Sequence, residues 1–265
     1  FASFLTNAFC EYVGYPMDTW IVPQPYSITS LACKDNLLLV GGDVLSVGPK
    51  TGHIAVYDRG TKKLRGNFPY VDGTVTNSVS DGSGGWFIAG DFTRIGCVER
   101  NGIAHIFGDG ILDAQWNPIR FSGNTFYNML QVSENAVFFN DINNILYAVS
   151  KFGSGDTLWE LPLQTLYYYD VLHYSSYNNL LYLALHENIC IGEACSLLNG
   201  RIYAIDAGAG DYTDLSIESN DFIYALYSKY DTLYIGGVFS SIAGLQRNGL
   251  ASYDMASGQF TSWCP

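Results

Sequence analysis

The chain has 265 residues, of which 15% are aromatic and 28 are glycine, and its formal net charge is −12. This acidic balance argues against nucleic acid and anionic membranes as partners, because both attract a Lys/Arg-rich surface. Since no apolar run approaches the ~20 residues of a membrane-spanning helix, we expect no direct membrane insertion. Aromatic residues and glycines together favour short strands joined by tight turns, so an all-β fold is predicted.

A repeat runs through the whole chain, and its endings carry a tryptophan followed closely by a proline. The four copies of this ending contain Trp20, Trp116, Trp159 and Trp263. The repeating unit is about 48 residues long, which suits one four-stranded blade of a β-propeller. We therefore expect the four tryptophans to occupy equivalent places on outermost strands.

The first 23 residues match only the outer half of a blade. Phe1 aligns with Phe92 and Phe239, which stand where a second strand closes. Residues 1–23 are thus predicted to form the third and fourth strands of a sixth blade. Its inner two strands would come from polypeptide outside these 265 residues, either an upstream part of a longer protein or an adjacent subunit.

Five complete blades are predicted after this half blade, within a single propeller domain spanning 1–265. Their ranges are 27–70, 74–119, 125–163, 167–218 and 222–265. In the last blade the expected strands are 222–227, 232–239, 249–253 and 260–263. Paired glycines at 41–42 and 236–237 end the second strand, where glycine indicates a bulge or a close backbone approach.

The last blade carries the pattern Leu233-Tyr-Ile-Gly-Gly-Val-Phe239, then Arg247-Asn-Gly-Leu-Ala251 and Trp263-Cys-Pro265. It resembles the delta-60 repeat, a β-propeller repeat of secreted and surface proteins in bacteria, and is also similar to the extracellular propeller of fungal cortical-marker proteins. The resemblance is good in 74–119 and 222–265 and fair in 27–70. It implies a propeller at the cell exterior and carries no catalytic residues.

Six cysteines are present, and disulfides suit them better than a zinc site, which places the protein outside the cytosol. Cys190 and Cys195 enclose a short loop between a second and a third strand and are expected to be bridged to each other. The pairing of the remaining four is left open; these are Cys10, Cys33, Cys97 and Cys264.

No enzyme signature appears, because the four histidines are spread over three of the predicted blades and no Gly-x-Ser-x-Gly elbow is present. No cofactor is expected, although Asp206, Asp211 and Asp214 share one turn region and leave calcium open. Aromatic rings that could bind a ligand cluster in the fourth blade, at Tyr167, Tyr169, Tyr174 and Tyr177. Tyrosine suits glycans and protein interfaces alike, with core packing as the alternative.

The sequence thus predicts a non-enzymatic extracellular or cell-surface propeller, a structural or adhesive module that mediates protein–protein assembly. The alternative is a carbohydrate-binding or carbohydrate-active propeller, a glycosidase or lyase. Two carboxylates facing each other in a pocket would favour hydrolysis. A flat face rich in tyrosine, or an unpaired sheet edge, would favour assembly.

Overall fold

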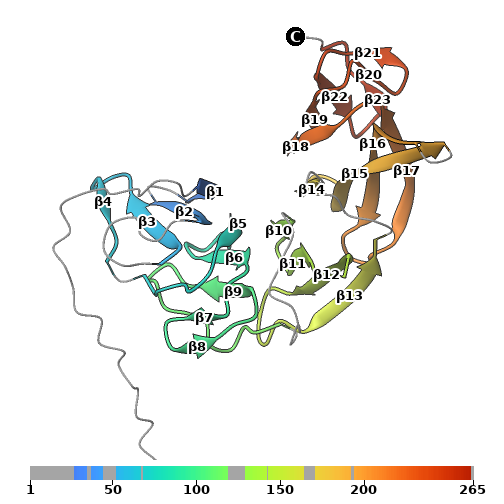
Figure 1. Ribbon diagram of the computed structural model, residues 1–265. Coiled ribbons are helices and arrows are strands. Elements are labelled where there is room, and N and C mark those ends of the chain that lie inside the picture. Colours follow the sequence, from blue (N-terminus) through green and yellow to red (C-terminus); the bar gives the residue numbers. More distant parts are fainter. Residues whose placement is uncertain are drawn as a thin grey trace, which may run out of the picture. The chain divides into compact units, whose positions relative to one another are not determined.

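The structure is a computed structural model that describes residues 27–34, 37–43, 52–66, 68–118, 129–141, 143–163, 171–191 and 194–263. All its regular elements are strands, arranged in small antiparallel sheets (Figure 1). No helix among these residues is long and apolar enough to cross a membrane. The chain divides into two compact units, Phe1–Ala114 and Gln115–Pro265. The predicted half blade 1–23, with Trp20 and Cys10, lies outside the described residues.

The first unit holds two blades, blade 1 and blade 2, and a separate two-stranded hairpin. Blade 1 has the order β1-β2-β3-β4, with strands Ser27–Lys34, Leu37–Asp43, Ile54–Asp58 and Lys63–Leu64. Blade 2 has the order β5-β6-β9, with strands Val75–Ser80, Trp86–Gly90 and Ile103–Ile106. Their facing side chains, among them Leu39, Val56, Trp86 and Ile88, form one buried apolar cluster.

The second unit holds three sheets, blades 3, 4 and 5. Blade 3 is β10 to β13: Leu130–Val132, Ala136–Asn140, Ile145–Ser150 and Thr157–Pro162. Blade 4 is β14 to β17: Val171–Ser175, Leu180–Ile191, Ala194–Asp206 and Tyr212–Ser219. Blade 5 is β18, β19, β22 and β23: Ile223–Lys229, Thr232–Gly237, Leu250–Asp254 and Gln259–Phe260.

Strand alternation gives each blade two packed faces. Along β15, Leu181 and Leu183 belong to the apolar cluster shared with blade 3, whereas Tyr182 and Ala184 belong to the cluster shared with blade 5. Successive side chains of a strand point to opposite faces, so a blade between two neighbours needs apolar residues at consecutive positions. This explains the nearly continuous apolar runs in the second strand of each repeat.

Short hairpins follow the second strand in two blades. One is β7–β8 (Arg94–Ile95 and Val98–Glu99), and the other is β20–β21 (Ser241–Ile242 and Leu245–Gln246). Each reaches back to the end of the preceding blade: β7 forms a bridge with Val71, and β20 pairs with β17. The repeated Phe-x-x-Ile motif at Phe92 and Phe239 therefore contributes to contacts between successive blades.

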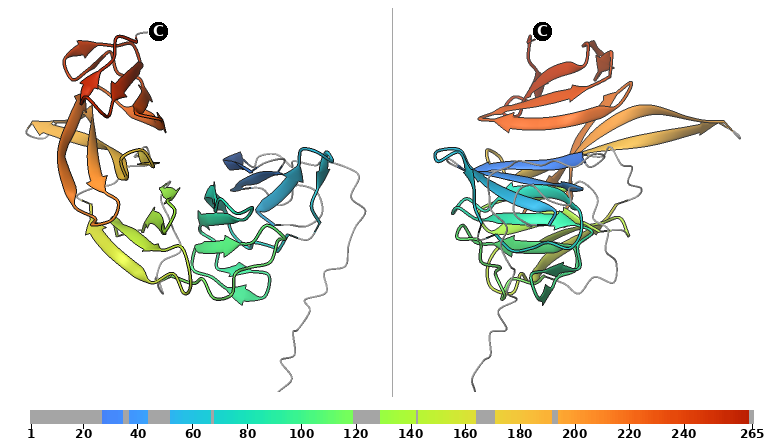
Figure 2. Two further views of the ribbon diagram at one scale, coloured as in Figure 1. Left: turned by 180° about the vertical axis from the view of Figure 1, so that it is seen from behind. Right: turned by 60° about the vertical axis from the view of Figure 1, so that its left-hand side comes forward.

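The hairpin β15–β16 extends beyond its own sheet, as the views in Figure 2 show. Its register continues to Cys190↔Cys195, although β14 pairs only with Leu180–Ala184 and β17 pairs only as far as Gly200. The two cysteines predicted to form a disulfide are thus direct cross-strand neighbours. Cys33 is exposed and free, and Cys97 is also exposed.

The paired glycines of blade 5 face different surroundings. A Cβ on Gly237 would lie 2.1 Å from the carbonyl oxygen of Phe222, while a Cβ on Gly236 would meet Ala225 and Leu250 at 3.6 Å. A strand bulge between Ile223 and Ala225 accompanies this close approach. The expectation of a bulge or close approach at paired glycines is therefore met at Gly237.

We expect Gly237→Ala to lower the free energy of unfolding by about 2 kcal/mol or more, because the backbone of β18 has to move. The matched variant Gly236→Ala should change it by less than about 1 kcal/mol. Urea denaturation of both variants measures the difference. Equal losses would show that the close approach at Gly237 has no energetic role.

Candidate interaction surface

A buried acid–histidine network occupies blade 2. The His105 ring lies between two carboxylates, with Nε2 3.2 Å from Asp81 Oδ2 and Nδ1 3.0 Å from Asp113 Oδ2. The Ser83 hydroxyl donates to Asp81 Oδ2 at 2.5 Å, and three backbone N–H groups of the same turn donate to Asp81 Oδ1. Burial alone would raise the pKa of Asp81, but hydrogen bonds from His105 and Ser83 outweigh it and lower the pKa below 3.8.

The geometry of this network is that of a structural anchor. A catalytic triad places histidine between a nucleophile and an acid, but here carboxylates meet both ring nitrogens and the Ser83 hydroxyl points to Asp81. The ring also stacks on Phe87 at 4.4 Å between centroids. Asp81 and Asp113 therefore fix the imidazole, and the network offers no free base or nucleophile.

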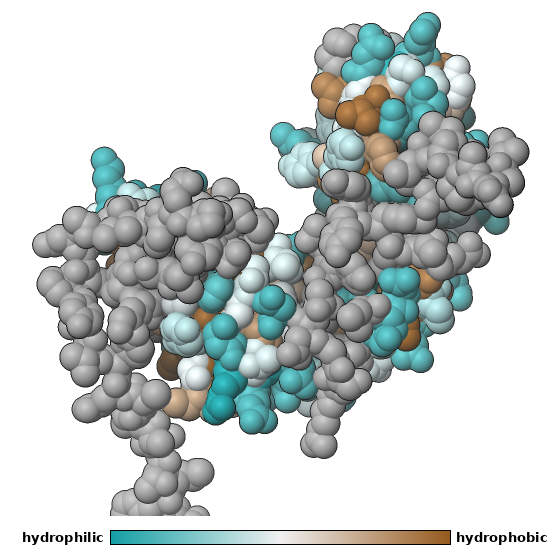
Figure 3. Space-filling model, in the orientation of Figure 1, coloured by the Kyte–Doolittle hydropathy of each residue, from teal (hydrophilic) through white to brown (hydrophobic). Residues whose placement is uncertain are grey.

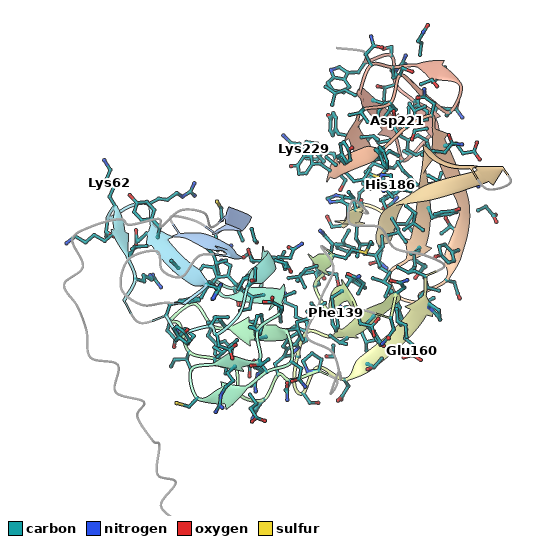
Figure 4. All side chains as sticks on the ribbon, viewed as in Figure 1. Lys62, Phe139, Glu160, His186, Asp221 and Lys229 are labelled. Atoms are coloured by element: carbon teal, nitrogen blue, oxygen red, sulfur yellow. The ribbon has the colours of Figure 1, made fainter. Side chains whose placement is uncertain are left out.

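Two histidines of blade 4 accept hydrogen bonds from the first strand of blade 5. The Ser228 N–H donates to His173 Nε2 at 2.8 Å, and the Ile223 N–H donates to His186 Nε2 at 3.3 Å. Figure 4 shows His186 at this side of β15. Because His173 Nε2 already accepts the backbone N–H, the Ser228 hydroxyl, also 2.8 Å away, has no free base beside it. Burial lowers the pKa of His173 to about 4, so the ring is neutral at pH 7.

In blades 3, 4 and 5, one face is formed by residues at equivalent positions. In blades 3 and 4 this is the face that packs against the next blade in chain order. Strand register makes Phe138, Tyr182 and Tyr234 equivalent, because each pairs with a small residue of the third strand. The corresponding third-strand positions are Leu146 and Ala148 in blade 3, Ile202 and Ala204 in blade 4, and Leu250 and Ser252 in blade 5.

The burial of these equivalent positions differs between blades. In blade 3 they are packed in the cluster with blade 4, and in blade 4 they are packed in the cluster with blade 5. Tyr182 is 1% exposed and Ile202 0%, whereas Tyr234 is 38% and Leu250 44% exposed in blade 5. Within the second unit, the described residues therefore leave this face of blade 5 uncovered.

The repeated tryptophans show the same difference. Trp116 Nε1 donates to the carbonyl oxygen of Ser150 in blade 3, and Trp159 Nε1 donates to that of Ala207 in blade 4. Each indole also lies against a glycine in a turn of the blade that supplies the carbonyl oxygen. A Cβ on Gly155 would lie 3.1 Å from the Trp116 indole, and a Cβ on Gly210 would lie 2.6 Å from the Trp159 indole. Each of these tryptophans is thus seated in the turn between the third and fourth strands of a following blade.

Trp263 has the equivalent place in blade 5, and the described residues of the second unit provide no such seat for it. Its ring contacts Tyr234 edge-on at 5.7 Å, as Trp159 contacts Phe138 at 5.8 Å. The indole is 43% exposed, and no described residue accepts a hydrogen bond from its Nε1. We call the surface formed by Ala225, Tyr227, Tyr234, Leu250 and Trp263 the open face.

The open face is aromatic and nearly uncharged. Tyr227 and Tyr234 are cross-strand partners with ring centroids 6.4 Å apart, an arrangement that stabilises the sheet and presents flat rings. The charged residues in the paired rows of this face are Lys229, at the end of β18 (Figure 4), and Asp254, both next to Thr232. Figure 3 shows apolar residues reaching the surface of this C-terminal blade.

The site residues predicted from sequence are not brought together as one ligand site. Tyr167 and Tyr169 lie outside the described residues; Tyr174 stacks on Phe138 in the interior, and Tyr177 is exposed. Asp206 Oδ1 accepts the N–H groups of Gly208 and Ala209 in its own turn. Within the described part of the chain, no three His, Cys, Asp or Glu side chains gather as metal ligands would. Calcium at Asp206, Asp211 and Asp214 stays a prediction.

Sequence reasoning missed Tyr227, Tyr234 and Leu250. In the printed sequence Tyr234 and Leu250 look like core residues, because their equivalents in blades 3 and 4 are apolar and buried. Tyr227 is equivalent to the polar residues Gln131 and His173. The sequence signal that could have found them is the repeat register, which aligns Tyr234 with Tyr182 and Phe138. The register alone does not say which of these positions is covered by a neighbouring blade.

Comparison with solved structures identifies the fold. The chain is similar to the computationally designed Ika8 protein (TM-score 0.58, 15% identity, covering 88% of this chain and 60% of that one). It is similar to the Pan2 WD40 domain of Neurospora crassa (0.55, 13%, 89% and 65%) and to Kuenenia stuttgartiensis hydrazine synthase (0.56, 11%, 93% and 68%). The chain adopts a β-propeller fold.

These identities show the fold alone. The chain spans about three fifths of the length of the first two of these structures. No protein-family model and no curated protein sequence matches it.

The partly buried His173 predicts a loss of stability in mild acid. In the unfolded chain His173 has a pKa near 6.5, whereas burial lowers the pKa to about 4 in the folded state. Between these pH values the unfolded chain binds a proton that the folded protein does not. The free energy of unfolding is therefore unaffected by this group above pH 6.5. It falls by at most about 3 kcal/mol as the pH drops from 6.5 to 4. His173→Gln is the matched control, because Gln131 accepts the N–H of Tyr174 in the same way in blade 3.

Urea unfolding at pH 7, 5.5 and 4.5 measures the effect. We expect His173→Gln to keep most of the stability at pH 7 and to flatten the decline between pH 6.5 and 4. An identical decline in both proteins would place the titrating group elsewhere.

Proposed function

We propose that this protein is a non-catalytic β-propeller that assembles with other proteins outside the cytosol, as a structural or adhesive module. The observation that carries the proposal is the open face of blade 5. Interface centres are rich in Tyr and Trp and poor in charge, and exposed Tyr227, Tyr234 and Trp263 have that composition in a chain of net charge −12.

An exterior location is supported by the cysteines and by the repeat. Cys190 and Cys195 face each other across an antiparallel ribbon, and neighbouring positions of such a ribbon lie within disulfide reach. We propose that they are bridged and that the repeats are of the delta-60 type. A disulfide would also stabilise this two-stranded ribbon, beside which the described residues place no further strand.

Carbohydrate binding is the second candidate, because exposed tyrosine and tryptophan rings also stack on sugars. The His105 network weighs against hydrolysis, since its two carboxylates are engaged with the imidazole and are not directed at each other across a pocket. Assembly is favoured over sugar binding because the residues equivalent to the open face pack against protein in blades 3 and 4.

A photo-crosslinking residue in place of Tyr227, in the protein made by its source cells, tests assembly. We expect covalent adducts with another polypeptide from Tyr227 and none from the matched position Tyr177, which is similarly exposed, at 52% against 58%. Digestion of the same sample without reduction should yield Cys190 and Cys195 in one disulfide-linked product.

Free thiols at both cysteines would contradict the exterior location. Equal adducts from Tyr227 and Tyr177 would contradict a specific protein interface. Binding of the purified protein to a glycan array, abolished by Tyr234→Ala, would favour the carbohydrate alternative.

A further inference from the structure

The hairpin of β15 and β16 is held by neighbouring strands only along its inner part. Its last anchored pair is His186↔Gly200, where the Ile223 N–H donates to His186 Nε2 and the Ser219 hydroxyl donates to the carbonyl oxygen of Gly200. Beyond this pair, neither β14 nor β17 pairs with the hairpin. We call its outer part, residues 187–191 and 194–199, the arm.

A register shift marks the base of the arm. It lies between Glu187 and Asn188, where the ladder leaves the anchored part of the hairpin. From there the two strands pair only with each other among the described residues, and a two-stranded ribbon is marginally stable in water. A link between the strands near the far end therefore decides how much of the arm stays paired.

The register places two cysteines at a specific kind of cross-strand position. Only two residues separate Ile191 from Ala194, and a hairpin loop of that length is flanked by a hydrogen-bonded pair. Pair types alternate along an antiparallel ladder, so the next pair, Cys190↔Cys195, is a non-hydrogen-bonded pair. The Cα atoms of such pairs are about 4.5 Å apart, whereas disulfides most often join Cα atoms about 5.5–6 Å apart.

A disulfide at this position is easier to reduce than a typical structural disulfide. The short Cα separation lies at the lower limit of disulfide geometry, and strained disulfides are the reducible ones. The bridge also closes only the short ring from Cys190 to Cys195, so it gains less from chain entropy than a bridge across a long loop. Both effects favour the dithiol.

We propose that Cys190 and Cys195 form a reversible dithiol–disulfide switch, whose substrates are low-molecular-weight thiols such as glutathione and whose state decides whether the arm is paired. This inference rests on the disulfide of the proposed function and adds that the bridge is labile and holds the arm.

The exchange is a two-electron reduction of the bridge by two small thiols. A thiolate attacks one cysteine sulfur, the Cys190–Cys195 bond breaks, and the other sulfur leaves as a thiolate. A second small thiol, also as its thiolate, then displaces the first from the mixed disulfide. The two small thiols become one disulfide, and the protons they lose are taken up by the two cysteines.

Equilibration of the purified protein in glutathione buffers measures how labile the bridge is. Thiol alkylation and peptide mapping give the reduced fraction of the pair at each redox poise. We expect the pair to be oxidised at the poise of the secretory pathway and at least half reduced at that of the cytosol. A pair that stays fully oxidised at the cytosolic poise would overturn the switch.

Hydrogen exchange measures the effect on the arm. On reduction we expect the N–H groups of the pairs Ile189↔Ser196 and Ile191↔Ala194 to exchange faster by about tenfold or more, because the ribbon opens more often. The internal control is Leu181–Ala184, which pairs with both β14 and β16 and should not change. Unchanged exchange in the arm, with the pair reduced, would also overturn the proposal.

The matched variant combines Cys190→Ser with Cys195→Ser and keeps the other four cysteines. Its arm should exchange as fast as that of the reduced protein, with or without reductant; a response to reductant would assign the effect to other cysteines and contradict the switch. Because these measurements use purified protein, they are independent of its location in the cell. Free thiols in protein from source cells would contradict the exterior location, whereas an irreducible bridge would contradict only the switch.

Discussion

Face-to-face packing of successive blades is the constraint on which the other features depend. A single four-stranded sheet of this size cannot bury both faces by itself, and blade 4 gains its core from blade 3 on one face and from blade 5 on the other. The indole of one repeat then lies in the glycine turn of the next, as Trp159 does at Gly210. This contact joins an apolar surface to one directional hydrogen bond, so it sets both the distance and the register between blades.

The polar groups at these interfaces follow the same logic. A buried N–H on the first strand of a blade needs an acceptor, and the preceding blade supplies one: Gln131 for Tyr174 and His173 for Ser228. His173 is therefore kept neutral by burial and acts as an acceptor, not as a base. In blade 2, His105 is fixed by Asp81 and Asp113 instead. Histidines and carboxylates that could suggest catalysis are used to hold strands together.

Much of the fold could be predicted from the sequence because the repeat is long and four of its copies end in a marker tryptophan. The β-propeller class follows from the recurring apolar second strand and from the tryptophan endings. The predicted strand 260–263 was too long, since β23 is Gln259–Phe260; the N–H of Thr261 still donates to Ser252. The open face could not be predicted, because Tyr234 and Tyr182 have the same local pattern and differ only in whether a blade covers them. A single sequence does not encode that difference locally.

Comparing Gly210→Ala with Gly258→Ala tests the central role of the tryptophan seat most directly. Both glycines have positive φ, so alanine costs each about 1 kcal/mol through backbone strain. At Gly210 alone the added Cβ would lie 2.6 Å from the Trp159 ring. We predict that the free energy of unfolding, measured in urea, falls by about 1–2 kcal/mol more for Gly210→Ala, and that Trp159→Ala removes this excess. Equal losses in both variants would contradict the account.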